Sequence, residues 1–476
     1  MLRATTLTLT SVCILTLGAL VAVPASGTAG SGTAGSGSPD GGRDLTSAGG
    51  QRVAPSELKD AAALAGQTVD QVTDLLTEDP SARLTGGNRL YYADTFEGAG
   101  AASDAEPAAR ASAPLSQTFR LHSRPGSRRT IYLDFDGERV CDSEWSQGLR
   151  PRCYDAPGFD TNGRAGFGAG ERRAIQSTWR RTAEDYAPFQ VDVTTERPPA
   201  DALTRSGSAD TTFGVHSVIT GSTTIRNQVC GGPGCAGVAL VGVFNHPAAN
   251  GARVFWVFPR EVDNRPQQMG LVVAHEAGHT LGLSHDGKNG NAYYTGHGIW
   301  APIMGSSLRP LTQWSRGEYV GATERENDLS VMRAHGAPYR ADDHAARLSR
   351  ATRLRSGLAR AGVIGRRNDT DVFRLRTTCR ARLSVQVANA PYSPNLDVSL
   401  TLLNRNGRVL ARRNPLSARS GSPTGLDASY VGTRTAGTYY VRVDGVGARD
   451  PRSTGYSDYG SLGNYRVKFR SRCGVR

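Results

Sequence analysis

Lysine is nearly absent from this 476-residue chain: Lys59, Lys288 and Lys468 are the only lysines among its 56 basic residues. The formal net charge is +13, but the arginines that supply it are scattered along the sequence. Nucleic-acid binding proteins gather such residues on one element and interleave them with aromatic side chains. We therefore expect no nucleic-acid partner.

Long hydrophobic runs are equally scarce. One apolar run from Leu7 to Val23 follows Met1-Leu2-Arg3 and leads to Ala25, which is typical of a secretory signal peptide cleaved after Ala25. No later run reaches the roughly 20 apolar residues that a membrane-spanning helix needs. We expect a secreted, extracellular protein with no membrane span.

Cysteine is uncommon too, with seven in the chain. Cys13 lies in the middle of the apolar run, after Val12, which is not the position of a lipoprotein anchor. The remaining six are an even number in an oxidising compartment, where disulfides form and persist. Three disulfide bonds are expected.

Shifts in composition divide the chain into parts. Residues 26–50 are mostly small and polar, with too little apolar surface to offset chain entropy. A helical pattern from Pro55 to Leu84 and the apolar Leu90-Tyr91-Tyr92 form a small module of the kind that serves as a propeptide in secreted enzymes. The expected parts are a signal peptide (1–25), a low-complexity linker (26–50), a propeptide module with its linker (51–118), a main domain (119–345), an arginine-rich linker (346–365) and a C-terminal domain (366–476).

The main domain mixes both kinds of secondary structure. Apolar residues at helical spacing predict a helix over Glu171–Tyr186, and strands are expected at 131–135, 191–195, 213–220, 238–244 and 253–258. The last third shows only strand patterns, at 372–375, 382–387, 398–403, 409–411, 439–443 and 465–469, with a hairpin signal at Asn406-Gly407. The sequence predicts an α+β domain followed by an all-β sandwich.

The most informative stretch runs from His275 to His285 and reads HEAGHTLGLSH. Residues four apart share one face of a helix, so His275 and His279 converge while Glu276 lies beside them. Gly282 can adopt the positive φ that ends a helix, which lets His285 turn back to the same point. Three neutral nitrogen ligands leave Zn²⁺ an open position at which its bound water can ionise near neutral pH. One catalytic zinc ion is expected, and the sequence does not indicate calcium.

This HExxHxxGxxH pattern, with Pro302-Ile303-Met304-Gly305 downstream, resembles the metzincin metallopeptidases. The resemblance implies a mixed twisted sheet with a zinc-binding active-site helix, in which His275, His279 and His285 are ligands and Glu276 is the general base. It also implies that Met304 forms a hydrophobic floor beneath the metal. Asp286 matches the structural aspartate of the reprolysin-like branch, whereas Ser306 stands where many metzincins carry a tyrosine.

The likeness extends over about residues 128–335, through IYLDFDG, CGGPGCAGVALVGVF and LTQWSRGEY, and is to a bacterial secreted branch of these enzymes. The last third, with Asp397, Asn406-Gly407 and the run from Ala436 to Val441, is similar to bacterial pre-peptidase C-terminal domains. The resemblance implies a secreted zinc endopeptidase that hydrolyses peptide or protein substrates by Glu-assisted attack of a zinc-bound water. We expect it to be made as a zymogen, and the resemblance implies that the substrate lies along the strand at Gly237–Phe244.

Cysteine pairs are expected within domains in this layout, namely Cys141–Cys153, Cys230–Cys235 and Cys379–Cys473. Pro151-Arg152-Cys153 resembles the cysteine switch of matrix metalloproteinases, but a bond to Cys141 would consume its thiol. Activation is expected by cleavage within Arg124–Arg129. We expect the C-terminal domain to fold alone, to be dispensable for short peptides, and to bind a surface or polymer or to aid secretion.

Two other functions remain open. A non-catalytic adhesion or carbohydrate-binding protein could use the zinc only to staple its fold, but such a site has no use for Glu276 and normally has a fourth protein ligand. A gluzincin peptidase would lack Gly282 and His285 at these positions and would take a glutamate from a later helix.

Overall fold

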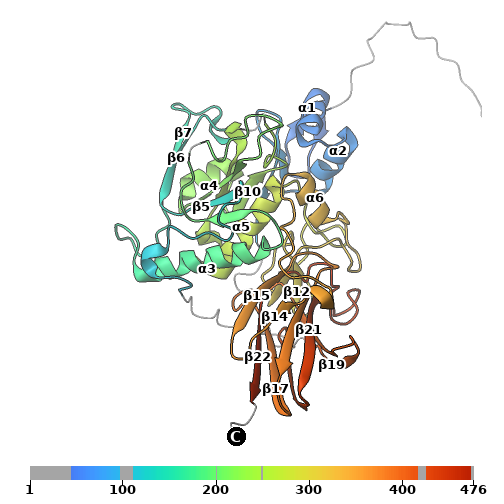
Figure 1. The fold of residues 1–476 in the computed structure, drawn as a ribbon. Helices are drawn as coiled ribbons and strands as arrows, with labels where there is room; N and C mark the ends of the chain where they lie inside the picture. The colour runs from blue at the N-terminus through green and yellow to red at the C-terminus, as the bar shows by residue number, and fades with distance from the viewer. Residues whose placement is uncertain (1–43, 97–110, 200, 248–249, 416–424, 473–476) are drawn as a thin grey trace, which may run out of the picture. The chain divides into compact units, whose positions relative to one another are not determined.

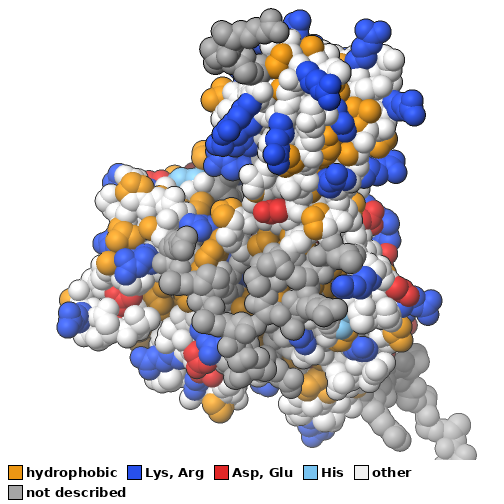
Figure 2. All heavy atoms as spheres, turned by 90° about the horizontal axis from the view of Figure 1, so that it is seen from below, with side chains coloured by type: hydrophobic (Ala, Val, Ile, Leu, Met, Phe, Trp, Pro, Cys, Tyr) orange, Lys and Arg blue, Asp and Glu red, His pale blue; other side chains and the backbone are white. Residues whose placement is uncertain are grey.

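The computed structural model describes residues 44–96, 111–199, 201–247, 250–415 and 425–472. The expected signal peptide and most of the following linker lie outside these residues. Within them, no helix is both long and apolar enough to cross a membrane. On the face drawn in Figure 2, Lys and Arg predominate among the charged side chains.

The N-terminal module contains two helices where the sequence suggested one helical stretch. Helix α1 (Pro55–Ala65) ends at Gly66, whose φ of 67° no helix can continue. Helix α2 (Val69–Glu78) begins at Thr68, whose hydroxyl accepts a hydrogen bond from the Gln71 amide. The module's strands are β1 (Leu45–Thr46), β2 (Arg52–Val53), β3 (Ala82–Leu84) and β4 (Leu90–Asp94).

A seven-stranded mixed sheet forms the centre of the first two thirds of the chain, in the order β3-β4-β10-β11-β9-β5-β8. Strands β11, β9, β5 and β8 are parallel, whereas β10 is antiparallel to both β11 and β4. Two strands of the N-terminal module therefore extend the same sheet. The remaining bounds are β5 (Arg129–Asp134), β8 (Asp192–Thr194), β9 (Phe213–Ile219), β10 (Gly237–Leu240) and β11 (Val254–Val257).

Two long helices, α3 (Ala169–Asp185) and α5 (Pro266–Thr280), pack on each other beside this sheet (Figure 1). The Tyr186 hydroxyl, just after α3, donates a hydrogen bond to the Ala274 carbonyl of α5 at 2.9 Å. Every described side chain from Gln267 to Thr280 is buried, so α5 is a core helix. Shorter elements are α4 (Thr223–Cys230), α6 (Asp328–Ala334), β6 (Gly137–Cys141), β7 (Cys153–Pro157), β12 (Trp300–Pro302) and β13 (Leu311–Gln313).

The last third consists of two sheets, ordered β14-β16-β21-β18-β19 and β15-β22-β17-β20. Alternate residues of both sheets are buried in one hydrophobic cluster, the pattern expected of a β-sandwich. The strands are β14 (Thr352–Arg353), β15 (Ala359–Ile364), β16 (Thr370–Thr377), β17 (Ala381–Asn389), β18 (Val398–Asn404), β19 (Val409–Arg413), β20 (Ala428–Arg434), β21 (Gly437–Gly445) and β22 (Gly463–Arg472). Sequence patterns missed β14, β15 and β20. Because β14 and β15 pair with strands of the two sheets, the stretch 346–365 that composition marked as a linker is part of the sandwich.

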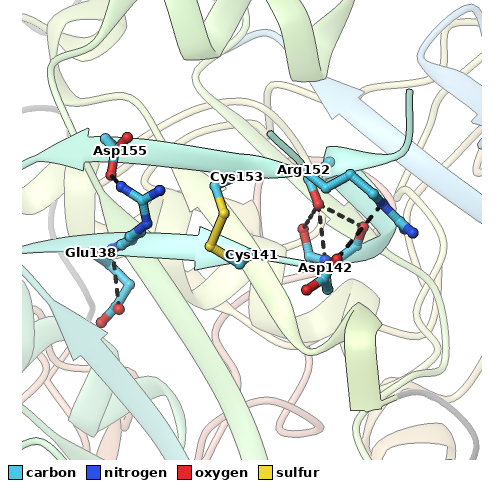
Figure 3. The surroundings of a disulfide bond; sticks show 9 residues. Glu138, Cys141, Asp142, Arg152, Cys153 and Asp155 are labelled. Atoms are coloured by element: carbon cyan, nitrogen blue, oxygen red, sulfur yellow. Dashed lines mark hydrogen bonds and ion pairs between the residues drawn. A yellow bond between two sulfur atoms is a disulfide. The ribbon is translucent and has the colours of Figure 1, made fainter. Parts of the chain in front are cut away.

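Disulfides join neighbouring segments as expected at two of the three pairs. Cys141 and Cys153 connect β6 to β7 (Figure 3), and Cys230 is bonded to Cys235. Cys379 is disulfide-bonded as well, whereas Cys473 lies outside the described residues. Because Cys153 is bonded to Cys141, its thiol is consumed and cannot act as a cysteine switch.

Candidate metal centre

Helix α5 and the turn after it bring the three predicted histidines together. His275 and His279 lie one helical turn apart, and their rings are 4.7 Å apart between centroids. The helix ends at Thr280, and Gly282 has a φ of 90°. A Cβ on Gly282 would lie 2.6 Å from the His335 ring, so both backbone and space require glycine there. The turned chain returns His285 to within 4.8 Å of the His279 ring centroid.

Each histidine is oriented by a hydrogen bond from its Nδ1. His275 donates to the Ile303 carbonyl at 2.9 Å, His279 to the Leu283 carbonyl at 2.8 Å, and His285 to the Asp79 carboxylate at 2.6 Å. The three Nε2 atoms are thereby left facing one another, with His279 and His285 3.1 Å apart at these atoms. Such outer hydrogen bonds fix the tautomer and ring orientation of histidines that bind metals.

A fourth group, Asp94 at the end of β4, lies among the three Nε2 atoms. Its Oδ2 is 3.0 Å from His279 Nε2 and 3.3 Å from His275 Nε2, and its Oδ1 is 3.3 Å from His285 Nε2. All four residues are buried, and their ligand atoms lie within 4.8 Å of one another. Sequence reasoning missed Asp94 because it lies 181 residues before His275 in a module that carries no ligand spacing of its own.

Glu276 lies in the same buried pocket of side chains but makes no hydrogen bond among the described residues, although both of its oxygens are buried. Burial and the nearby Asp94 carboxylate raise the pKa of Glu276 well above its usual value. Gly237 of β10 packs against this side chain, and a Cβ at Gly237 would overlap the Glu276 carboxylate. An unpartnered buried carboxylate beside three histidines is chemically suited to proton transfer.

Met304 and Asp286 lie near the three histidines but are not among the possible metal ligands. Met304 is fully buried, and its Sδ is 2.7 Å from the position that a Cβ on Gly278 of α5 would take. The Asp286 amide donates to the Met304 carbonyl at 2.9 Å, and the Asp286 carboxylate accepts from the Tyr319 hydroxyl at 3.3 Å. Burial raises the pKa of Asp286 to about 7. Both residues therefore buttress the turn that carries His285.

Tyr293 reaches the centre from a segment that sequence reasoning did not single out. Its hydroxyl donates to Asp94 Oδ1 at 2.8 Å, and its ring lies 4.3 Å from the His285 ring. Ser306, at the position of the missing tyrosine, is buried and its hydroxyl has no partner among the described residues. A phenol that contacts the centre thus comes from before the methionine turn and not from the position of Ser306.

The charges of the four groups complement one another. Burial opposes ionisation of Asp94, but His285 and His279 outweigh it and lower the pKa of Asp94 well below its usual value. Burial likewise opposes protonation of His285, but Asp79 and Asp94 raise its pKa to about 10. Burial lowers the pKa of His279 to about 4.

The donor set fits zinc. Three imidazole nitrogens and a carboxylate oxygen are ligand types that Zn²⁺ takes in tetrahedral sites. His275 Nε2 has no hydrogen-bond partner among the described residues although it is fully buried, which is costly unless another group is bound there. The buried group can therefore hold a metal ion.

Two other groups of carboxylate and imidazole side chains lie apart from this centre. Asp134 and Glu138 lie near His216, and Asp342 and Asp343 lie near Asp371. The first group is already paired, because Asp134 contacts His216 Nε2 at 2.8 Å and Arg197 at 3.3 Å. The Asp134 carboxylate is therefore already partnered by His216 and Arg197.

No family model and no curated protein matches the chain. Among solved structures, it is similar to the pre-peptidase C-terminal domain of a collagenase from Bacillus anthracis, at 14% identity and a TM-score of 0.18 over 28% of this chain and 98% of that chain. It is also similar to PliG of Aeromonas hydrophila, a periplasmic inhibitor of g-type lysozyme, at 10% identity and a TM-score of 0.17 over 26% and 96% of the two chains. Neither similarity carries weight for function at such scores.

Proposed function

We propose that this protein is a secreted zinc-dependent endopeptidase. The observation that carries the proposal is the buried group of three histidine Nε2 atoms beside Glu276, whose carboxylate has no partner among the described residues. His275, His279 and His285 would hold the ion. When bound, zinc supplies a Lewis acid that polarises a peptide carbonyl and lowers the pKa of water.

The chain's own groups account for the rest of the chemistry. Glu276 accepts the proton that water loses as it attacks the carbonyl and passes it to the leaving amine. The Tyr293 hydroxyl, which donates to Asp94 Oδ1, is placed to donate to the carbonyl oxygen of a substrate instead. The hydrogen bonds to Ile303, Leu283 and Asp79 fix the orientation of the three imidazole rings.

The substrate would be an extended peptide on strand β10. This strand already pairs antiparallel with β4, with Gly237 opposite Asp94 and Leu240 opposite Tyr91. The edge of β10 that now pairs with β4 therefore offers the backbone groups for an extended strand that ends at the metal centre. A peptide in the place of β4 would present its backbone beside Glu276.

A structural zinc site in an adhesion protein is the second candidate, and one observation favours it. Asp94 completes a set of four protein ligands, as in zinc sites that only stabilise a fold. Glu276 argues the other way, because burying a carboxylate without a partner costs free energy that a purely structural site has no reason to bear.

The test is digestion of a denatured protein by the secreted, processed form, with new peptide termini identified by mass spectrometry. We expect cleavage within chains, loss of cleavage after zinc is chelated with 1,10-phenanthroline, and recovery when zinc is returned. Absence of cleavage by processed protein that contains zinc would favour the structural-zinc alternative.

A further inference from the structure

We infer that Asp94 is a fourth ligand of the zinc ion and that its strand, β4, occupies the substrate position, so that the precursor carries its own competitive ligand. This inference rests on the proposed peptidase function and adds its regulation. Asp94 and β4 lie outside the histidine motif. With Asp94 bound, the metal centre would be closed to substrate until the precursor is processed.

The position of Asp94 is the first argument. Strand β4 fills the free edge of β10, and the Asp94 carbonyl accepts a hydrogen bond from the Ala236 amide at 2.7 Å. Its side chain then turns into the centre, within 3.3 Å of all three histidine Nε2 atoms. A strand that ends in a carboxylate at this point resembles a bound peptide whose carbonyl has been replaced by a stronger ligand.

The coordination set is the second argument. A catalytic zinc site has three protein ligands and leaves the fourth position to water or substrate, whereas four protein ligands close a tetrahedral site. With Asp94 bound, its Oδ1 also takes the hydrogen bond of Tyr293. The carboxylate would therefore exclude both the attacking water and the substrate carbonyl.

The neighbours of Asp94 hold the strand in place. Tyr92 is fully buried and its ring stacks on His279 at 4.4 Å, while Phe96 contacts the His275 ring edge to face at 5.2 Å. Asp79, from the same module, binds His285 Nδ1. The module therefore supplies one ligand, one outer partner and two aromatic walls, and all of them would leave together.

Asp94 and the histidines belong to one chain, which explains why Asp94 would stay at the metal and how cleavage would release it. Two groups in one chain meet at an effective concentration on the order of millimolar. A segment with a dissociation constant of about 1 μM would then leave only about one site in 10³ open. Hydrolysis of one peptide bond between Asp94 and β5 makes the contact bimolecular, so dilution in the extracellular medium releases the module.

The test uses the intact full-length precursor loaded with Co²⁺, whose visible absorption reports its ligands, and titrates azide as an exchangeable anion. Wild type and Asp74→Ala, a change on the exposed face of α2 in the same module, are expected to give spectra that azide does not alter. Asp94→Ala is expected to bind Co²⁺ near one equivalent, to respond to azide, and to raise precursor peptide cleavage at least about tenfold.

Each other outcome has one meaning. An equal azide response in wild type and Asp94→Ala would overturn the inference, as would failure of the wild-type chain to bind Co²⁺, which would also overturn the peptidase proposal. An azide response confined to Asp94→Ala without any cleavage would uphold the ligand and overturn the proposed function. Asp94→Asn, which keeps the side-chain shape, replaces Asp94→Ala if that variant does not fold.

Discussion

The position of the Glu276 carboxylate depends on one neighbouring residue, Gly237. Gly237 begins the strand that lies against α5, and its missing side chain leaves the space that the Glu276 carboxylate fills. Any larger residue there must push the carboxylate away or move the strand. The glycine therefore sets the position of the proposed base without touching the metal ligands.

We predict that Gly237→Ala lowers peptide cleavage by at least about tenfold while zinc content stays near one equivalent, because the added Cβ displaces Glu276 and not the histidines. Steady-state rates and elemental analysis on the same processed preparation measure both quantities. Gly232→Ala is the matched control, since a Cβ there meets no atom within 4 Å. Full activity in Gly237→Ala would show that Glu276 is not held by this contact.

The residues of the centre differ in how far the sequence could predict them. His275, His279 and Gly282 follow from local helix geometry, so spacing alone brought them together. Asp94 and Tyr293 could not be found in this way, because strand pairing and a loop bring them to the histidines and neither carries a spacing signal. The apolar run Leu90-Tyr91-Tyr92 was expected only as part of the N-terminal module, and neither strand β4 nor its pairing with β10 was predicted.

At the scale of elements, β10 is shorter than its sequence predicts. The apolar run continues to Phe244, but the strand ends at Leu240. Gly242 has a φ of 70°, and its amide and that of Phe244 donate to the carbonyls of His279 and Thr280 at the end of α5. The chain thus leaves the sheet, and its amides pair with the free carbonyls at the end of α5, the helix that carries His275 and His279. The hydrophobic pattern alone does not reveal this.

Helix α3 is joined to strand β22 by a buried carboxyl group. Glu184 near the end of α3 accepts hydrogen bonds from the Asn464 amide at 2.8 Å and from its side chain at 2.6 Å. Burial nevertheless raises the pKa of Glu184 to about 7. Because the folded state holds this proton more tightly than the unfolded chain does, stability from this group is present below about pH 4.5 and lost as the pH rises through 7.

We therefore predict that the free energy of unfolding of wild type falls between pH 5 and pH 8 by up to about 3 kcal/mol more than that of Glu184→Gln, which cannot ionise. Urea unfolding at the two pH values measures the difference. Glu78→Gln, at an exposed position in α2, should behave as wild type. Parallel pH dependence in wild type and Glu184→Gln would show that Glu184 is not protonated in the folded state.

At the scale of the whole chain, one hydrophobic cluster runs from the strands around β5 into both sheets of the last third. Hydrogen bonds cross the same boundary, from Asn395 to Asp185 at 2.8 Å and from Tyr459 to Asn327 at 2.8 Å. Composition marked a linker at 346–365 but could not reveal this shared core. Independent folding of residues 366–476 stays a prediction, and these contacts weigh against it.

The N-terminal module is also tied to the rest of the chain. The Arg83 side chain donates to the Cys230 carbonyl at 3.1 Å, and the Thr85 hydroxyl donates to Glu144 at 2.6 Å. Beyond the module, the amides of Ser112 and Ala113 donate to Gln176 of α3. The cleavage expected within Arg124–Arg129 would detach these last residues from the chain that carries α3, and terminal sequencing of the secreted form locates it.

The most direct test of the account is the cleavage rate per bound metal in Glu276→Ala. The substitution leaves His275, His279 and His285 in place, so zinc should remain close to one equivalent. The rate should fall by about 10² to 10⁴, the usual contribution of one general base. Wild-type cleavage by zinc-loaded Glu276→Ala would contradict the account and leave zinc with a structural role.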